Sequence, residues 1–176
     1  MPEDTKLVVM GVAGCGKSTL ALGLAEALAA LCLEGDEFHP PASVDKMRRG
    51  IPLKDSDREP WLARIGEALW AHPGPVVASC SALRQRYRDL LRRQVPALKF
   101  AYLRITQEQA LERVRGRSGH YMPPELVRSQ FEVLEPPVDE DGVITVEATW
   151  PTPLQVRTVL AWLEAPDALP PSHLPR

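Results

Sequence analysis

The chain contains no asparagine, little net charge and few lysines. Without asparagine it lacks the Asn-Lys-x-Asp motif that guanine-reading switch proteins usually carry, which argues against that class. The net charge of −2 supplies no basic field for a polyanion, so nucleic acid is not an expected partner. Sixteen of the twenty-one cationic residues are arginine, and the planar guanidinium group suits bidentate contacts to carboxylate or phosphate.

Cysteine and long apolar runs are also scarce. The three cysteines, Cys15, Cys32 and Cys80, are odd in number and lack C-x-x-C spacing, so they predict reduced thiols and no zinc or redox site. No stretch approaches the roughly 18 apolar residues of a membrane span, and the first ten residues lack the basic start and apolar run of a secretory signal. We therefore expect a cytoplasmic protein with no membrane partner.

The chain length suits one globular domain, since two full domains would be crowded in 176 residues. Short apolar or β-branched runs alternate with segments of helical period. Strands are predicted at residues 6–10, 31–34, 76–81, 98–103 and 143–146. Parallel neighbours need a crossover, so this alternation predicts an α/β fold of three layers around a central, mostly parallel five-stranded sheet. The domain should span residues 1–164, before a proline-rich tail at 165–176.

One helix start is marked by a capping box. Thr106 can accept a hydrogen bond from the free amides of a first helical turn, while Gln109 reaches back to the residue that precedes the turn. A helix is therefore predicted to begin at Thr106.

A phosphate-binding loop is the strongest single motif. Residues 11–18, GVAGCGKS, fit G-x-x-x-x-G-K-[ST] and lie between a predicted strand and a predicted helix. Inward-pointing amides and the helix N-terminus would cradle phosphate, Lys17 would neutralise it, and Ser18 would hold Mg²⁺. The alternative is a glycine-rich turn with a chance Lys-Ser. The motif predicts ATP and Mg²⁺ as cofactors, with nucleotide contacts from Gly11, Ala13, Gly14, Cys15, Gly16, Lys17, Ser18 and Thr19.

Several further segments resemble the gluconokinase family of small P-loop kinases. They are residues 35–40 (GDEFHP), 46–47 (KM), 50–61 (GIPLKDSDREPW), 80–90 (CSALRQRYRDL), 119–122 (GHYM) and 129–131 (SQF). The resemblance spans about residues 6–160. The chain departs from the family pattern at Ser43, where asparagine is usual, at Glu34, where aspartate is usual, and in the missing Walker B aspartate of the third strand.

The resemblance implies ATP-dependent phosphorylation of D-gluconate to 6-phospho-D-gluconate, a step that feeds the catabolism of carbohydrate acids and the pentose phosphate pathway. It also implies a P-loop fold like that of the nucleoside monophosphate kinases, with a mobile lid at about 115–123, and it is compatible with a homodimer. The small-molecule partner is gluconate.

Two carboxylates follow the second predicted strand. Asp36 lies at the carboxyl edge of the sheet, where α/β folds bind ligands, and could orient or deprotonate an acceptor hydroxyl. Helix capping or turn formation is the alternative role for Asp36. Glu34 could face the same site and hold a magnesium-bound water.

Four other side chains are candidates for substrate binding. Arg58 and Arg84 suit the carboxylate of an acid substrate, with ordinary surface ion pairs as the alternative. His39 can hydrogen-bond a polyol or fix a turn before its two prolines, and Gln130 has the same two readings.

A run of cations interrupted by Gly116 and Gly119 resembles the lid of this kinase group. Arg117 is the expected phosphate contact and catalytic residue, and His120 is an expected substrate contact. Arg113 is expected on one side of the adenine, with the loop at 149–153 on the other. A solvated charged face is the alternative reading of this run.

Three other functions share part of this pattern. Shikimate kinase or another small hydroxy-acid kinase would have the same P-loop and a carboxylate after the second strand. A nucleotide-operated switch would turn over slowly without depending on an acceptor. The third is a P-loop protein that binds ATP without catalysis; the presence of Lys17, Ser18, Asp36 and the lid arginines together argues against it.

Overall fold

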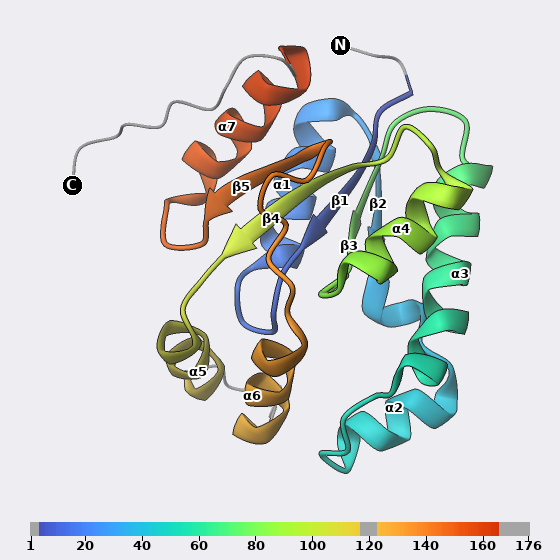
Figure 1. Ribbon diagram of the computed structural model, residues 1–176. Coiled ribbons are helices and arrows are strands. Elements are labelled where there is room, and N and C mark those ends of the chain that lie inside the picture. The colour runs from blue at the N-terminus through green and yellow to red at the C-terminus, as the bar shows by residue number, and fades with distance from the viewer. Residues whose placement is uncertain (1–3, 117–122, 166–176) are drawn as a thin grey trace.

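A parallel five-stranded sheet forms the centre of the protein (Figure 1). The computed structural model describes residues 4–116 and 123–165. The strands are β1 (Lys6–Met10), β2 (Leu31–Glu34), β3 (Val76–Ser79), β4 (Lys99–Arg104) and β5 (Val143–Glu147), in the order β2-β3-β1-β4-β5, and every neighbouring pair is parallel. All five predicted strands are confirmed. β3 ends two residues earlier than predicted, and Ala82, shortly after its end, has a φ of 42°.

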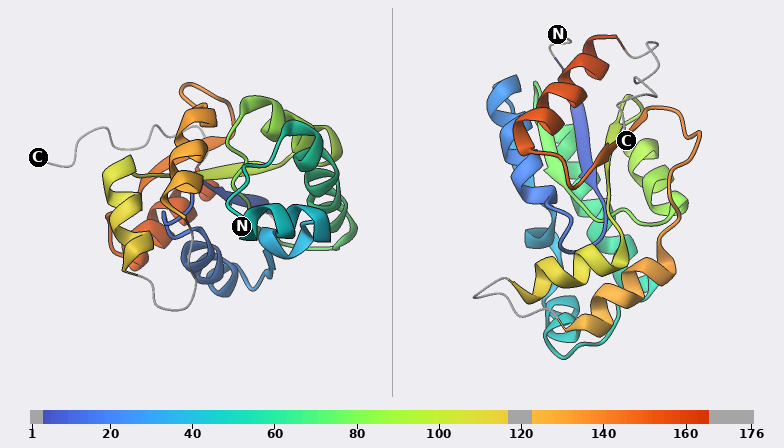
Figure 2. Two further views of the ribbon diagram at one scale, coloured as in Figure 1. Left: turned by 90° about the horizontal axis from the view of Figure 1, so that it is seen from below. Right: turned by 90° about the vertical axis from the view of Figure 1, so that its left-hand side faces the viewer.

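Helices cover both faces of the sheet, which confirms the three layers (Figure 2). One face packs against α1 (Lys17–Leu28) and α7 (Thr152–Glu164), and the other packs against α3 (Asp55–Ala71) and α4 (Gln85–Gln94). The short helix η1 (Gly35–Phe38), α2 (Pro41–Arg48), α5 (Gln107–Arg115) and α6 (Pro124–Val133) complete the described elements.

The central strand shows why both faces need cover. All five residues of β1 are buried, and successive side chains point to opposite faces. Leu7 and Val9 pack toward α1 and α7, whereas Val8 and Met10 pack toward α3 and α4. Each such side chain contributes about 1.5–3 kcal/mol by leaving water. The sheet is thus fixed as a rigid support for the loops at its edge.

The predicted capping box at the start of α5 is present. The Oγ1 atom of Thr106 accepts from the amide of Gln109 at 3.2 Å, and the Oε1 atom of Gln109 accepts from the amide of Thr106 at 3.1 Å. Two amides that the helix leaves free are therefore satisfied locally.

The carboxyl ends of the strands gather the loops and helices that matter for function. In Figure 1 the chain segments at this edge include α2, α5 and α6, while β1 begins at the opposite side of the sheet. Open α/β sheets bind ligands at this edge. All three cysteines are free thiols, as expected. Within residues 4–116 and 123–165, no helix combines the length and apolar character needed to cross a bilayer.

Candidate functional site

The phosphate loop connects β1 to α1, as the motif predicts. Gly14 has a φ of 80°, and a Cβ there would lie 2.9 Å from the Cγ2 atom of Val114 and 3.1 Å from the carbonyl oxygen of Ala110. Glycine is therefore required both by the backbone conformation and by the close approach of α5. The Nζ atom of Lys17 donates to the carbonyl of Val12 at 3.0 Å, which holds the lysine against its own loop.

A cleft of about 210 Å³ opens beside this loop. It collects residues from the phosphate loop, the end of β2, η1, the α2–α3 region and α6. Eleven of the predicted site residues line it: Ala13, Gly14, Gly16, Lys17, Ser18, Thr19, Glu34, Asp36, His39, Arg58 and Gln130. Met47, Pro52, Leu53, Trp61, Ser81, Leu126 and Ser129 complete its lining. Segments far apart in the sequence thus meet at one point of the sheet edge.

Asp36 presents its carboxylate to solvent on the side of the cleft. It lies in the first turn of η1, and its side chain is 83% exposed. The Nε2 atom of His39 lies 3.8 Å from Oδ1 of Asp36. A Cβ at Gly35 would lie 2.0 Å from the carbonyl oxygen of Ser79, so only glycine permits β2 to turn into η1 this close to β3. Asp36 is therefore held at a fixed place beside the phosphate loop.

Glu34 is oriented by the neighbouring strand. Ser79 donates its hydroxyl hydrogen to Oε1 of Glu34 and accepts from the amide of Gly35 at 3.2 Å. Ser79 lies at the end of β3, the strand that lacks a Walker B aspartate. The carboxylate at this edge thus comes from β2 and is positioned by a serine of β3.

His39 is buried against an indole ring. Its ring stacks on Trp61 with centroids 4.2 Å apart and an angle of 13°, and Trp61 donates from Nε1 to the carbonyl of Gly35 at 2.7 Å. Burial lowers the pKa of His39, and the nearby carboxylate of Asp36 opposes this shift only in part. The Nδ1 atom of His39 is buried and has no hydrogen-bond partner among the described residues. An uncharged imidazole therefore lines the cleft, with its Nδ1 atom buried.

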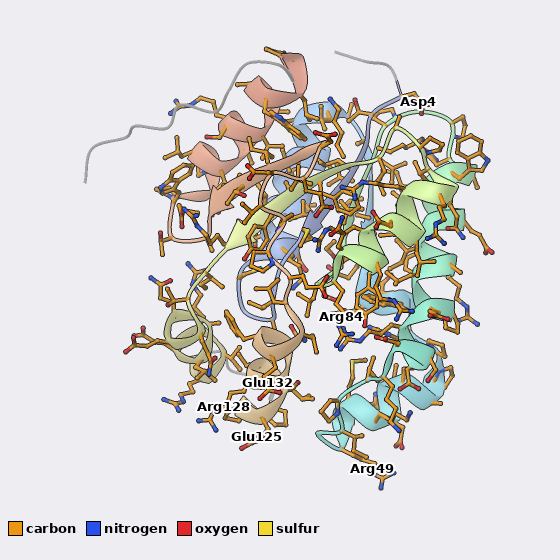
Figure 3. The ribbon with its side chains drawn as sticks, in the orientation of Figure 1. Asp4, Arg49, Arg84, Glu125, Arg128 and Glu132 are labelled. Carbon is orange, nitrogen blue, oxygen red and sulfur yellow. The ribbon has the colours of Figure 1, made fainter. Side chains whose placement is uncertain are left out.

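The two arginines proposed for the substrate carboxylate lie in different places. Arg58 lines the cleft and is 9% exposed. Arg84 does not line it; it directly precedes α4 without a capping hydrogen bond from its side chain, and Figure 3 shows it at the carboxyl edge. Its Nη1 atom lies 3.7 Å from Oδ2 of Asp55, and its buried Nε atom has no partner among the described residues. The structure thus brings only Arg58 into the lining of the cleft.

Gln130 contacts the phosphate loop directly. Its Oε1 atom accepts a hydrogen bond from the amide of Ala13 at 2.7 Å. This contact joins α6 to a loop 117 residues earlier in the chain. Gln130 is therefore placed to position the loop as well as to meet a ligand.

Arg113 bridges two loops on the other side. Its guanidinium donates to the carbonyl of Cys15 at 3.3 Å and to the carbonyl of Ala148 at 2.8 Å. The second contact lies directly before the loop at 149–153 that was expected beside the adenine. Cys15 and Gly11 belong to the body of the phosphate loop but do not line the cleft. Arg117 and His120 lie outside the described residues.

Some contributors were not identified from the sequence. Trp61 ends the 50–61 segment of the family resemblance, but the sequence assigns it no role in the site; in the structure it lines the cleft and supports His39. Ser79 was read only as a strand residue. Lys46 was noted only within a motif, and its Nζ atom lies 2.7 Å from Oδ1 of Asp57, which ties α2 to the start of α3. A polar residue ending a buried strand was the available signal for Ser79.

Known proteins share this arrangement. A family model described as an AAA domain matches residues 7–137. A gluconokinase of Gluconobacter oxydans is 44% identical over 144 residues, which cover 80% of this chain and 80% of that protein. The crystal structure of a gluconokinase from Sinorhizobium meliloti superposes with a TM-score of 0.86 at 44% identity, over 93% of this chain and 94% of the other. The shikimate kinase of Aquifex aeolicus, at 18% identity and a TM-score of 0.61 over 92% of this chain and 98% of the other, shares the fold alone. The chain belongs to the gluconokinase family.

Proposed function

We propose that the protein transfers the γ-phosphoryl group of ATP to the 6-hydroxyl group of D-gluconate and releases ADP and 6-phospho-D-gluconate. Membership of the gluconokinase family supports the choice of acceptor. One observation carries the chemistry: the phosphate loop, the carboxylate of Asp36 and the guanidinium of Arg58 line a single cleft. A phosphate donor, a hydroxyl and an anionic group can therefore be held there together.

The phosphate loop would hold the donor. The loop amides and the N-terminus of α1 would receive the phosphate oxygens, and Lys17 would leave its contact with the carbonyl of Val12 to neutralise them. Phosphoryl transfer asks the protein mainly for positioning and charge stabilisation. The glycines give the loop its shape in the absence of a ligand, so the loop can position the phosphates without rearranging.

The same cleft offers oxygen donors that fit Mg²⁺. Ser18 and Glu34 both line it, and hydroxyl and carboxylate oxygens are ligands that Mg²⁺ accepts. The described residues contain no cluster of three His, Cys, Asp or Glu side chains suited to a metal, so phosphate oxygens and waters would complete the shell. When bound, the ion neutralises charge that develops on the transferred group.

The acceptor would bind between Asp36 and Arg58. The exposed carboxylate of Asp36 can accept a hydrogen bond from the attacking hydroxyl and take up its proton. The neutral ring of His39 lines the cleft and can bind another hydroxyl of a polyol. The lid contacts of Arg117 and His120 stay predictions.

An acceptor panel tests the proposal. Purified protein is incubated with Mg-ATP and D-gluconate, shikimate, D-glycerate or AMP, and ADP release is measured. D-gluconate should give the highest kcat/KM, with a product oxidised by 6-phosphogluconate dehydrogenase. Asp36→Asn should lower kcat about 10²–10⁴-fold. A higher kcat/KM with shikimate would identify shikimate as the acceptor instead. ADP release at the same rate with and without each acceptor would favour a nucleotide switch.

We propose a cytosolic location and a homodimer on the strength of the family resemblance. Light scattering coupled to gel filtration would measure the mass in solution. A mass of one chain, 19.5 kDa, would contradict the dimer.

A further inference from the structure

Two arginines are buried in the part of the chain that the structure describes, and only one of them is paired with a carboxylate. Arg88 is 1% exposed and fully paired: its guanidinium contacts both carboxylate oxygens of Glu140 at 2.7–3.1 Å, the carbonyl of Ala82 at 2.9 Å and the carbonyl of Glu135 at 3.1 Å. Arg58 is 9% exposed, yet no described carboxylate lies within 4 Å of its nitrogens. Buried charges are normally paired, so Arg58 is suited to bind an anionic group that the described residues do not supply.

An uncharged ring holds Arg58 in place. Its guanidinium carbon lies 5.6 Å from the centre of the Tyr87 ring, within the range of a cation–π contact, and its Nε atom makes one long hydrogen bond, 3.4 Å, to the carbonyl of Leu53. Neither contact supplies a negative charge. The arginine is thus oriented without being neutralised.

The ring of Tyr87 is fixed by the carboxylate of Asp55, which also binds Arg86. Tyr87 is 1% exposed and donates its hydroxyl hydrogen to Oδ1 of Asp55. Burial, together with this hydrogen bond, raises the pKa of Tyr87 to about 12, so the phenol stays uncharged at neutral pH. The other oxygen of Asp55 accepts from Nη1 of Arg86 at 2.8 Å. Asp55 therefore locks the ring and pairs directly with Arg86, whereas Arg58 feels its charge only from beyond 4 Å.

We propose that Tyr87 is a positioning residue for acid recognition: its ring, locked by Asp55, aims the unpaired guanidinium of Arg58 at the carboxylate of the substrate. The inference rests on the proposed function, because it assumes that an acid is the acceptor. It assigns the preference for a sugar acid over the matching neutral polyol to this pair. Arg58 contacts the substrate, whereas Tyr87 acts only through Arg58.

A purely structural role for Tyr87 makes a different prediction. Tyr87 also packs α4 against α3 in the core, so its loss could simply loosen the protein. Loosening would affect ATP and acceptor alike. A positioning role affects the acid acceptor alone, and only while Arg58 is present.

The test uses kinetics on the full chain with D-gluconate, D-glucitol and ATP. The variants are Tyr87→Leu, Tyr87→Phe, Asp55→Asn, Arg58→Met and the double variant Tyr87→Leu/Arg58→Met. Leu91→Ala is the matched control, since Leu91 is fully buried one turn further along α4, in the same core, and does not line the cleft.

Tyr87→Leu should raise the KM for D-gluconate about tenfold and leave the KM for ATP within twofold. Tyr87→Phe, which keeps the ring, and Asp55→Asn, which frees it, should each raise the KM for D-gluconate about two- to fivefold. Arg58→Met should remove most of the preference for D-gluconate over D-glucitol, and in that background Tyr87→Leu should add less than twofold. Leu91→Ala should change neither KM by more than twofold.

Equal changes in the two KM values, or a full tenfold effect of Tyr87→Leu without Arg58, would overturn the inference. If Tyr87→Leu does not fold, Tyr87→Phe and Asp55→Asn decide, because neither opens a large cavity; unchanged KM values in both would count against the positioning role. The unmodified protein tests the proposed function independently: if it does not phosphorylate D-gluconate, the proposed function fails before any variant is compared.

Discussion

The contact between Gln130 and the phosphate loop offers a direct test of how the cleft receives a nucleotide. The Oε1 atom of Gln130 accepts from the amide of Ala13 at 2.7 Å. Replacing Gln130 by glutamate keeps an oxygen in position for this hydrogen bond and adds one negative charge. Replacing it by alanine removes the hydrogen bond and adds no charge. The pair of variants therefore separates loop positioning from electrostatics.

The two effects differ in size. Loss of the neutral hydrogen bond should cost about 1 kcal/mol, which weakens nucleotide binding about fivefold. A carboxylate at roughly 6 Å from one phosphate charge, with an effective dielectric constant of about 20, is repelled by about 3 kcal/mol. Gln130 is half-buried, so solvent and salt reduce this value. We expect Gln130→Glu to weaken binding about ten- to hundredfold, more than Gln130→Ala.

The measurement is the Kd of a non-hydrolysable ATP analogue with Mg²⁺, obtained by calorimetry at low and high salt. Arg128→Gln is the control, because it changes the net charge by the same amount from the same helix. Arg128 is exposed, and Figure 3 shows it pointing away from the sheet. Its replacement should change the Kd less than twofold.

A Gln130→Glu variant that binds the analogue as tightly as Arg128→Gln would refute the reasoning. It would mean that phosphate does not occupy the loop next to Ala13. The difference between glutamate and alanine should also shrink as salt is added, since the extra repulsion is electrostatic. A salt-independent difference would point to a change of loop shape instead.

Four further predictions follow from the structure. Lys17→Ala should lower kcat about 10²-fold or more when ADP release is measured with Mg-ATP and D-gluconate, while the circular dichroism spectrum stays that of the unmodified protein. Ser79→Ala frees the carboxylate of Glu34 and should raise the Mn²⁺ concentration needed for half-saturation of the nucleotide complex, measured by electron paramagnetic resonance. Arg88→Met removes one of the two arginines that pair with Glu140, leaves Arg92 2.7 Å from that carboxylate, and should lower the free energy of unfolding by about 1.5–3 kcal/mol in urea titrations. Burial acts to raise the pKa of Glu140, but hydrogen bonds from Arg88 and Arg92 outweigh it, so the pKa is lowered from the usual 4.5. The ionised carboxylate therefore stabilises the fold above pH 4.5, and this contribution is lost as the pH falls through the lowered pKa. Glu140→Gln should accordingly reduce the fall in the free energy of unfolding between about pH 6 and pH 3.

The fold could be predicted because its signals are local. Each strand is a short apolar run, and each crossover helix follows it at once, so pattern and topology agree. The phosphate loop is eight consecutive residues, and its shape depends mainly on its own glycines. The capping box at Thr106 spans four residues and was likewise predictable. What was harder to predict lies in contacts between distant segments.

The cleft shows this limit most clearly. His39 was left between two roles, and the stack on Trp61 that fixes it joins residues on different helical segments. The hydrogen bond from Ala13 to Gln130 crosses 117 positions, so no spacing rule could predict it. Family resemblance supplied several such residues as a group, but it did not say which of them touch one another.

The arginines show why physical context decides a role that residue type leaves open. Arg58 and Arg88 are both buried and both lie on helices that pack on the same face of the sheet. They differ because the loop before β5 brings Glu140 to Arg88, 52 positions away, whereas no carboxylate in residues 4–116 and 123–165 lies within 4 Å of the nitrogens of Arg58. Because a carboxylate of the chain itself pairs with Arg88, this arginine stabilises the fold. Under the proposal above, Arg58 meets its carboxylate on the substrate, and the ring of Tyr87 supports a guanidinium that no described carboxylate contacts within 4 Å.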